Sequence, residues 1–313
     1  MSIGITNIQY VLPEQAHTLE ALEASGRLES PAGRLREFGF DRVHVSAEPA
    51  ETLAIEAVGR LLRESAVDPE SIDAIFYAGA IPASHCAGAA AENFLHGFNY
   101  PVSRVQFECG LVNAAAAGVS QLGCLGLMSA VRSAEGFLAA SPAANRVICV
   151  SADVFPHAAP REVIYNAISD GAAALLIERG AARNRLLAYR QITKGYYWDC
   201  IARKNEIVAA YFPTAQHIVR ETLTQAALTL EEIDWLLPHN VSRRSWEILL
   251  GLLGLPREKL FDRNIAAKGH VIAADNFINL ADLTDLGLAR PGQKLLMFNF
   301  GLGANWGCMI LEH

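Results

Sequence analysis

One cysteine, Cys124, stands where a run of small residues (115–120) gives way to a helical pattern. The apolar residues of that pattern recur at helical spacing: Leu127, Val131, Ala134 and Leu138. A cysteine at the start of a helix lies near unpaired amide groups and the positive end of the helix dipole, and both stabilise a thiolate. Gly123 and Gly126 let another backbone or a substrate come close. Cys124 is therefore a candidate nucleophile; the alternative is a buried cysteine at a helix start.

Two histidines in the second half of the chain could complete a thiol-based site. His239 follows the apolar strand pattern of residues 235–237, and α/β proteins bind ligands at the carboxyl ends of strands. His270 follows Gly269 and precedes a run of small residues. A cysteine with a histidine, assisted by a further polar group, is the arrangement that thiol acyl transfer requires. The alternatives are a structural role for His239 and a helix-capping role for His270. The pair His85–Cys86 is a competing candidate.

Composition limits the class of protein. The 313-residue chain is 51% hydrophobic and 19% charged, with a mean hydropathy of +0.19. Because average charged content is about 25%, we expect a large core together with either an obligate dimer interface or buried internal helices, and we exclude disorder. The net charge of −7 and the absence of a basic block argue against a nucleic-acid partner. No apolar run approaches the roughly 20 residues of a membrane span.

The ends and the cysteines of the chain give two further expectations. The first residues lack a basic stretch followed by an apolar one, so we expect a cytoplasmic protein. The six cysteines have irregular spacings without a C-x-x-C pair, so we predict no metal centre and no disulfide framework.

The chain shows an internal duplication. In each half an amphipathic helix pattern leads to an Ile-Asp pair and then to an apolar strand pattern, and the two aspartates, Asp73 and Asp234, lie 161 positions apart. Two further strand patterns close each half. Because helices alternate with short apolar strands, we predict an α/β protein with a mostly buried sheet. We place the halves at residues 1–182, with the nucleophile, and 183–313, with both histidines.

These features, together and in order, resemble the β-ketoacyl-acyl carrier protein synthase III family, condensing enzymes of the thiolase superfamily. The segments that carry the resemblance are Cys124 with its helix, Pro238–Asn240, Gly269–His270 and Phe300–Gly307, with Val11–Glu14, Leu111–Ala114 and Ser169–Ala172 between them in family order. The resemblance implies a thiolase-like fold of two duplicated α/β halves in a five-layered αβαβα arrangement. It also implies a homodimer.

The resemblance also implies roles for individual residues. Cys124 would take an acyl group from a coenzyme A or acyl carrier protein thioester, with no permanently bound cofactor. The amides of Cys124 and Gly303 would form the oxyanion hole. His239 would activate the thiol or bind the second thioester, with His270 as the third catalytic residue. Phe300, Gly301 and Asn240 would line the pocket.

The sequence departs from the family pattern at three places. His270 stands where the family usually has Asn, and unlike Asn it can donate, accept or carry charge. Asn240–Ser242 replaces the family's Gln-Ala-Asn after the first histidine. The Trp and Arg with which the family usually contacts coenzyme A would fall near Gly33 and Glu37 of this sequence. Their replacement favours a carrier protein as acyl donor. Five arginines could meet the carrier's acidic helix or simply face solvent: Arg34, Arg36, Arg42, Arg243 and Arg244.

Three functions remain open at the level of sequence. The first is decarboxylative condensation of an enzyme-bound acyl group with a malonyl thioester. The second is transfer of the acyl group to an amine or hydroxyl without loss of CO₂. The third is a non-catalytic partner of another synthase, against which the presence of Cys124 and His239 argues. The segment 81–90 is a candidate to reach the partner's pocket across the dimer.

Overall fold

The computed structural model describes residues 2–81 and 98–313. The competing pair His85–Cys86, and the segment 81–90 except for its first residue, lie outside the described residues. Within the described ranges no helix has the length and apolar character that crossing a membrane requires.

The first half forms a sheet covered by helices on both faces. Its strands are β1 (Ile3–Val11), β4 (Ala74–Ala78), β5 (Ala115–Val119), β6 (Arg146–Asp153) and β9 (Gly171–Arg179). Their order is β1-β9-β6-β4-β5; β4 runs parallel to β5 and β6, and β9 is antiparallel to β6 and β1. The helices are α3 (Ala50–Ser65), α4 (Pro101–Glu108) and α5 (Gly126–Ala140). Apolar residues of α3 and of α5 join separate cores on opposite faces of this sheet.

The second half repeats this plan. Its strands are β10 (Arg185–Thr193), β11 (Ile233–Leu237), β12 (Lys294–Gly301) and β13 (Asn305–Glu312), and its helices are α6 (Lys204–Ala226), α7 (Arg243–Leu253), α8 (Arg263–Lys268) and α9 (Asp275–Asp285). The order β10-β13-β12-β11 matches β1-β9-β6-β4, with the same parallel and antiparallel pairings. The described residues of this half hold no counterpart of β5.

The repeated aspartates explain why the two halves fold alike. Asp73 Oδ2 accepts a hydrogen bond from the amide of Arg146, the first residue of β6, at 2.9 Å. Asp234 Oδ2 accepts one from the amide of Lys294, the first residue of β12, at 2.7 Å. Each aspartate therefore ties its strand to the start of the neighbouring parallel strand, and the predicted duplication is confirmed.

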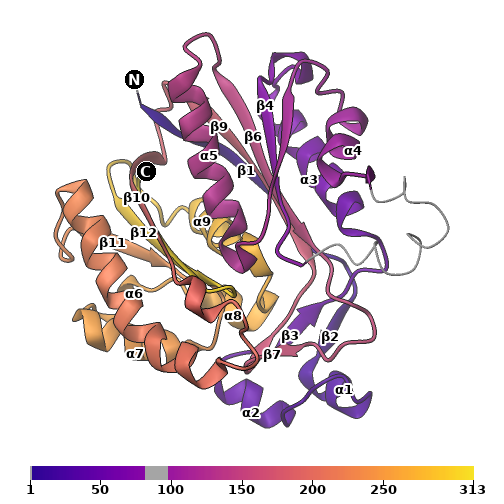
Figure 1. Cartoon of the computed structure of the whole chain (residues 1–313), viewed down its shortest axis with the longest axis vertical. Coiled ribbons are helices and arrows are strands. Elements are labelled where there is room, and N and C mark those ends of the chain that lie inside the picture. The colour runs from indigo at the N-terminus through magenta and orange to yellow at the C-terminus, as the bar shows by residue number, and fades with distance from the viewer. Residues whose placement is uncertain (1, 82–97) are drawn as a thin grey trace.

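The two sheets and their helices form five layers. Figure 1 shows α3 and α4 on one side, α6 and α7 on the opposite side, and α5 and α9 between the sheets. Strands β1 and β10 join the sheets through the pairing of Gly4 with Arg185. One buried core lies between the sheets, and one lies under each outer helix layer. The proposed boundary at residue 182 falls in the turn between β9 and β10.

Smaller elements surround the ends of the strands. They are β2 (Ala16–Thr18), α1 (Leu19–Ala24), α2 (Ala32–Glu37), β3 (Arg42–His44), β7 (Glu162–Val163), β8 (Asn166–Ala167) and the 3₁₀ turns at 69–71, 123–125, 195–197, 257–259 and 272–274. Helices α1 and α2 lie with β2, β3 and β7 at one end of the molecule (Figure 1).

Candidate active site

Cys124 lies in the turn Gly123–Leu125, directly before α5. This turn presses against the end of β12. A Cβ atom on Gly301 would lie 1.9 Å from the carbonyl oxygen of Leu122, and one on Gly123 would lie 2.8 Å from the amide nitrogen of Leu302. Only glycines permit so close an approach. The turn that holds Cys124 and the β12–β13 connection, which holds Gly303, are therefore neighbours.

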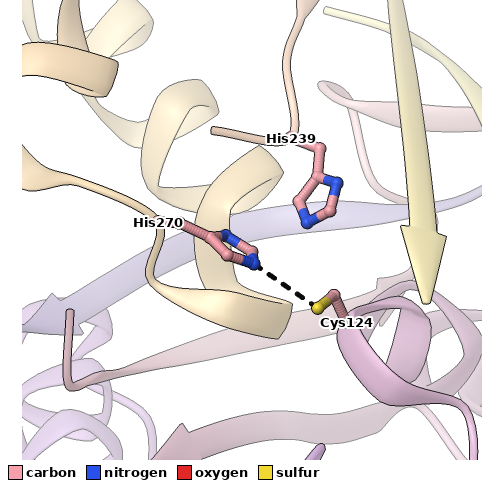
Figure 2. A group of neighbouring side chains, drawn as sticks. All are labelled: Cys124, His239 and His270. Atoms are coloured by element: carbon pink, nitrogen blue, oxygen red, sulfur yellow. Dashed lines mark hydrogen bonds between the residues drawn. The ribbon is translucent and has the colours of Figure 1, made fainter. Parts of the chain in front are cut away.

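The structure brings Cys124, His239 and His270 together from three separate segments (Figure 2). Cys124 Sγ lies 3.5 Å from His270 Nε2, although the two residues are 146 positions apart. The rings of His239 and His270 meet edge to face, with centroids 4.5 Å apart. His239 extends from the carboxyl end of β11, and His270 from the loop between α8 and α9.

The residue that governs the charge of His270 is Asp275, for which no role was predicted from the sequence. His270 Nδ1 lies 2.6 Å from Asp275 Oδ2, and Asp275 is completely buried. The carboxylate also accepts hydrogen bonds from the amides of Val271 and Asn240, both at 2.7 Å. Burial lowers the pKa of His270, but the charges and hydrogen bonds of Asp275 and Cys124 outweigh it and raise this pKa to about 10. At neutral pH an imidazolium therefore lies beside the sulfur.

His239 has the opposite charge state. Its ring is 2% exposed, and neither ring nitrogen has a hydrogen-bond partner among the residues that the structure describes. Burial, and then the positive charge of His270, hold the pKa of His239 well below its usual range. A neutral imidazole with two unpartnered nitrogens is suited to bind a polar atom of a substrate.

Helix α9 fixes the segments that carry the histidines through three buried side chains. Asp275 holds His270, as described above. Asn276 Nδ2 donates to the carbonyl of Leu237, the last residue of β11, at 3.0 Å and to that of Phe298, within β12, at 3.1 Å. Asn279 Nδ2 donates to the carbonyl of Pro238 at 2.8 Å, one residue before His239. The positions of both histidines therefore depend on this one helix.

Asn240, which we predicted in the pocket wall, has no exposed surface in this chain. Its side chain donates to the carbonyl of Gly269 at 3.1 Å and accepts from Asn279 at 2.9 Å. The structure therefore places it between the two histidine segments, which it ties together.

Of the other predicted pocket residues, Phe300 is half-buried and faces α6. Its ring contacts Tyr211 and Trp306, with centroids 5.3 and 4.9 Å away. Gly301 is buried against the turn that holds Cys124, as described above. A cavity of about 920 Å³ begins beside Gln121, three residues before Cys124, and is lined mainly by apolar residues of the first half.

The segment Ser169–Ala172 supports the His270 loop. The amide of Ser169 donates to the carbonyl of His270 at 2.9 Å, and its hydroxyl donates to the carbonyl of Lys268 at 2.6 Å. Asp170 forms a completely buried ion pair with Arg161. This pair ties the residue before β7 to the segment between β8 and β9, which also holds Ser169.

Most of the predicted partner arginines have carboxylate neighbours. Arg36 pairs with Glu20, Arg42 with Asp41, and Arg243 with Asp262. Arg34 instead lies over the ring of Tyr165, with 4.8 Å between the guanidinium carbon and the ring centroid. Arg244 is exposed.

Comparison with known proteins agrees with this architecture. Residues 223–313 match the family described as 3-oxoacyl-[acyl-carrier-protein (ACP)] synthase III C terminal. The β-ketoacyl-[acyl-carrier-protein] synthase III of Lactococcus lactis subsp. lactis is 28% identical, over 88% of both chains. That of Rhodobacter capsulatus is 26% identical over 98% of both. The crystal structure of 3-oxoacyl-[acyl-carrier-protein] synthase III from Aquifex aeolicus superposes with a TM-score of 0.85 and 23% identity, covering 99% of this chain and 100% of that one.

The C-terminal part of the chain thus matches the synthase III family, and most of the chain is similar to synthase III enzymes. The predicted thiolase-like fold is confirmed. In this chain, the position at which the resembled family usually has Asn holds a histidine that is paired with a buried aspartate.

Proposed function

We propose that this protein is a condensing enzyme that loads an acyl group on Cys124 and joins it to a malonyl thioester with loss of CO₂. The observation that carries the proposal is the contact of Cys124 Sγ with His270, 3.5 Å away, whose ring is charged by Asp275. The neutral, unpartnered His239 beside them supplies a second group for the substrate.

The first step transfers the acyl group. The thiolate of Cys124, stabilised by the imidazolium of His270, attacks the thioester carbonyl of a coenzyme A or carrier-protein donor. The amides of Cys124 and Gly303 hold the oxyanion of the tetrahedral intermediate. The carbonyl re-forms, the donor thiolate leaves and takes a proton from solvent, and the acyl group stays on the sulfur. His270 keeps its proton.

The second step forms the carbon–carbon bond. A malonyl thioester binds with its thioester oxygen toward His239 and His270, which donate hydrogen bonds from Nε2. Loss of CO₂ leaves an electron pair as an enolate, and these donors stabilise its negative oxygen. The enolate carbon attacks the acyl carbon, the bond to sulfur breaks, and Cys124 returns as a thiolate beside the His270 imidazolium.

A second candidate function is transfer of the acyl group to a hydroxyl or amine. The order Cys124–His270–Asp275 is that of a nucleophile, a base and an orienting carboxylate. For His270 to act as this base it must be neutral, because it has to accept the proton of the acceptor. Since Asp275 favours the protonated ring, condensation is the better fit at neutral pH and transfer becomes competitive only at alkaline pH.

We also propose an acyl donor and an assembly state for the protein. The thioester is carried by coenzyme A or an acyl carrier protein, with the carrier protein favoured. We also propose a homodimer in the cytoplasm. Strand β5 (Ala115–Val119) is an edge strand, four of its five residues are exposed, and it carries no Lys or Pro to block pairing with another chain.

The test is intact-protein mass spectrometry after incubation with acyl- and malonyl-loaded coenzyme A and carrier proteins, with trapping of CO₂. We expect a mass gain of one acyl group, absent in Cys124→Ala, and CO₂ release only when an acyl and a malonyl thioester are both present. Product formation without CO₂ would favour the transferase. No adduct from any donor would refute the nucleophile and favour a non-catalytic partner.

A further inference from the structure

The three side chains of the site also form a set of metal ligands. Cys124 Sγ and one ring nitrogen from each of His239 and His270 all lie within 4.8 Å of one another. In a tetrahedral zinc site, with Zn–S of about 2.3 Å and Zn–N of about 2.0–2.1 Å, the sulfur and a nitrogen ligand are about 3.6 Å apart. The observed separation of Cys124 Sγ and His270 Nε2, 3.5 Å, already matches this value.

His239 is the ligand with the most freedom to complete the set. Its ring is 2% exposed, yet neither ring nitrogen has a hydrogen-bond partner among the described residues. In Figure 2 one of these nitrogens points toward the sulfur and the ring of His270. A neutral imidazole is the form that binds a metal, and no hydrogen bond from either ring nitrogen to a described residue opposes the rotation of the ring that ligation needs.

His270 has the outer support that metal-bound histidines usually have. Its far nitrogen, Nδ1, is bonded to Asp275, and the amides of Val271 and Asn240 hold that carboxylate. A carboxylate that binds the second ring nitrogen fixes the orientation of a ligating histidine and makes it a better ligand. The thiolate of Cys124 and the carboxylate of Asp275 also supply two negative charges for a divalent cation.

We propose that Cys124, His239 and His270 bind Zn²⁺ in the unacylated protein, and that the bound ion blocks loading of the acyl group. Binding displaces the proton from His270 Nε2. It also occupies the electron pair of Cys124 Sγ that would otherwise attack the thioester carbonyl. A fourth position stays open for water. The prediction of no metal centre rested on the spacing of the cysteines, which does not report a site that the fold assembles from three distant segments. The inhibitory part of this proposal rests on the proposed function; the metal site itself does not.

Binding is tested with Co²⁺ as the probe on the full chain, without any substrate. We expect one equivalent of Co²⁺ to give a thiolate-to-cobalt charge-transfer band and the visible bands of tetrahedral cobalt, both abolished when Zn²⁺ is added. Cys124→Ala removes the charge-transfer band, whereas Cys109→Ser, whose sulfur lies outside this site, keeps it. His239→Gln, which removes one ligand nitrogen, weakens binding at least about tenfold. No charge-transfer band, or equal affinity in the wild type and His239→Gln, overturns the site.

Inhibition is tested separately through the reactivity of Cys124. We expect Zn²⁺ to slow alkylation of Cys124 by iodoacetamide at least about tenfold, EDTA to restore it, and Mg²⁺ to have no effect because it prefers oxygen ligands. Acyl loading, followed by mass, is expected to slow in parallel. If no donor loads the protein, the cobalt and alkylation results still decide the metal site while the proposed function fails. If loading proceeds equally fast with Zn²⁺ bound, the inhibitory role is wrong.

Discussion

Replacement of Asp275 by Asn separates the charge of the site from its shape. The amide nearly matches the carboxylate in size, so packing around the completely buried position is kept. The oxygen of the new amide can still accept from the Val271 amide, but the side chain no longer carries the charge that holds His270 protonated. The pKa of His270 should then fall from about 10 toward its ordinary value of 6.5, because burial lowers it and only the contribution of Cys124 still raises it.

The size of the effect follows from these two values. At pH 7.5 a group with a pKa of about 10 is almost fully protonated, whereas one with a pKa of 6.5 is about one-tenth protonated. The population with an imidazolium beside the sulfur thus falls by up to about tenfold. Because the imidazolium stabilises the attacking thiolate, the rates of Cys124 alkylation and acyl loading should fall by about the same factor.

The assay is the rate of iodoacetamide alkylation of Cys124 between pH 5 and 10, followed by intact mass with Zn²⁺ removed by EDTA. Asp282→Asn is the matched control, since Asp282 is another mostly buried carboxylate of α9 but pairs with Lys268. We expect its profile to follow that of the wild type. Identical profiles for Asp275→Asn and the wild type would show that Asp275 does not set the charge of His270, and the reasoning would be refuted.

Four further outcomes test the remaining parts of the structure. Asn279→Ala should slow condensation about tenfold more than loading in single-turnover measurements, because Asn279 holds the backbone next to His239, the histidine that we propose binds the second substrate. Asn264 is another buried member of the same hydrogen-bond network, and Asn264→Ala should leave the ratio of the two rates unchanged. Gly301→Ala should destabilise the fold by about 3 kcal/mol in urea unfolding, because its Cβ would meet a backbone carbonyl at 1.9 Å. Arg161→Met should cost about 3–5 kcal/mol in the same assay, since it leaves a buried carboxylate unpaired. The free energy of unfolding of the wild type should decline between pH 6.5 and 10. The stabilisation that comes from the raised pKa of His270 is fully present below pH 6.5 and is lost as the pH rises through about 10. The unfolding free energy of Asp275→Asn should lack this dependence on pH.

The fold was predictable where local patterns repeat. Each Ile-Asp pair precedes a buried strand, and the structure shows that both aspartates bond the first amide of the next strand. The start of α6 was not predictable in this way. Helix α6 begins at Lys204 and continues through Pro213. Proline normally ends a helix, and here packing of α6 against the second sheet outweighs that preference.

The site was predictable to the extent that its residues carry signals of their own. A cysteine before a helix and a histidine after a strand stand out in the sequence, and the fold brings Cys124, His239 and His270 together. Asp275 lies five residues after His270, in an apolar stretch where an acidic residue is unusual, and that was the signal available. Its role depends on the direction of a side chain at a helix start. The direction of Asn240 depends in the same way on α9.

The pairing of His270 with Asp275 bears on the choice between the two candidate reactions. An enolate needs hydrogen-bond donors, and a histidine held as an imidazolium donates at every pH below its pKa of about 10. A hydroxyl or amine needs a base, which the same histidine becomes only after it has lost that proton. Asp275 stabilises the donor form and makes the base form scarce at neutral pH. Asp275→Asn should therefore slow condensation and leave transfer to an added amine equal or faster at pH 7.5, once the variant has been loaded. If the rates of condensation and of amine transfer fall together instead, Asp275 mainly orients the ring of His270. The charge of His270 then does not select between the two reactions.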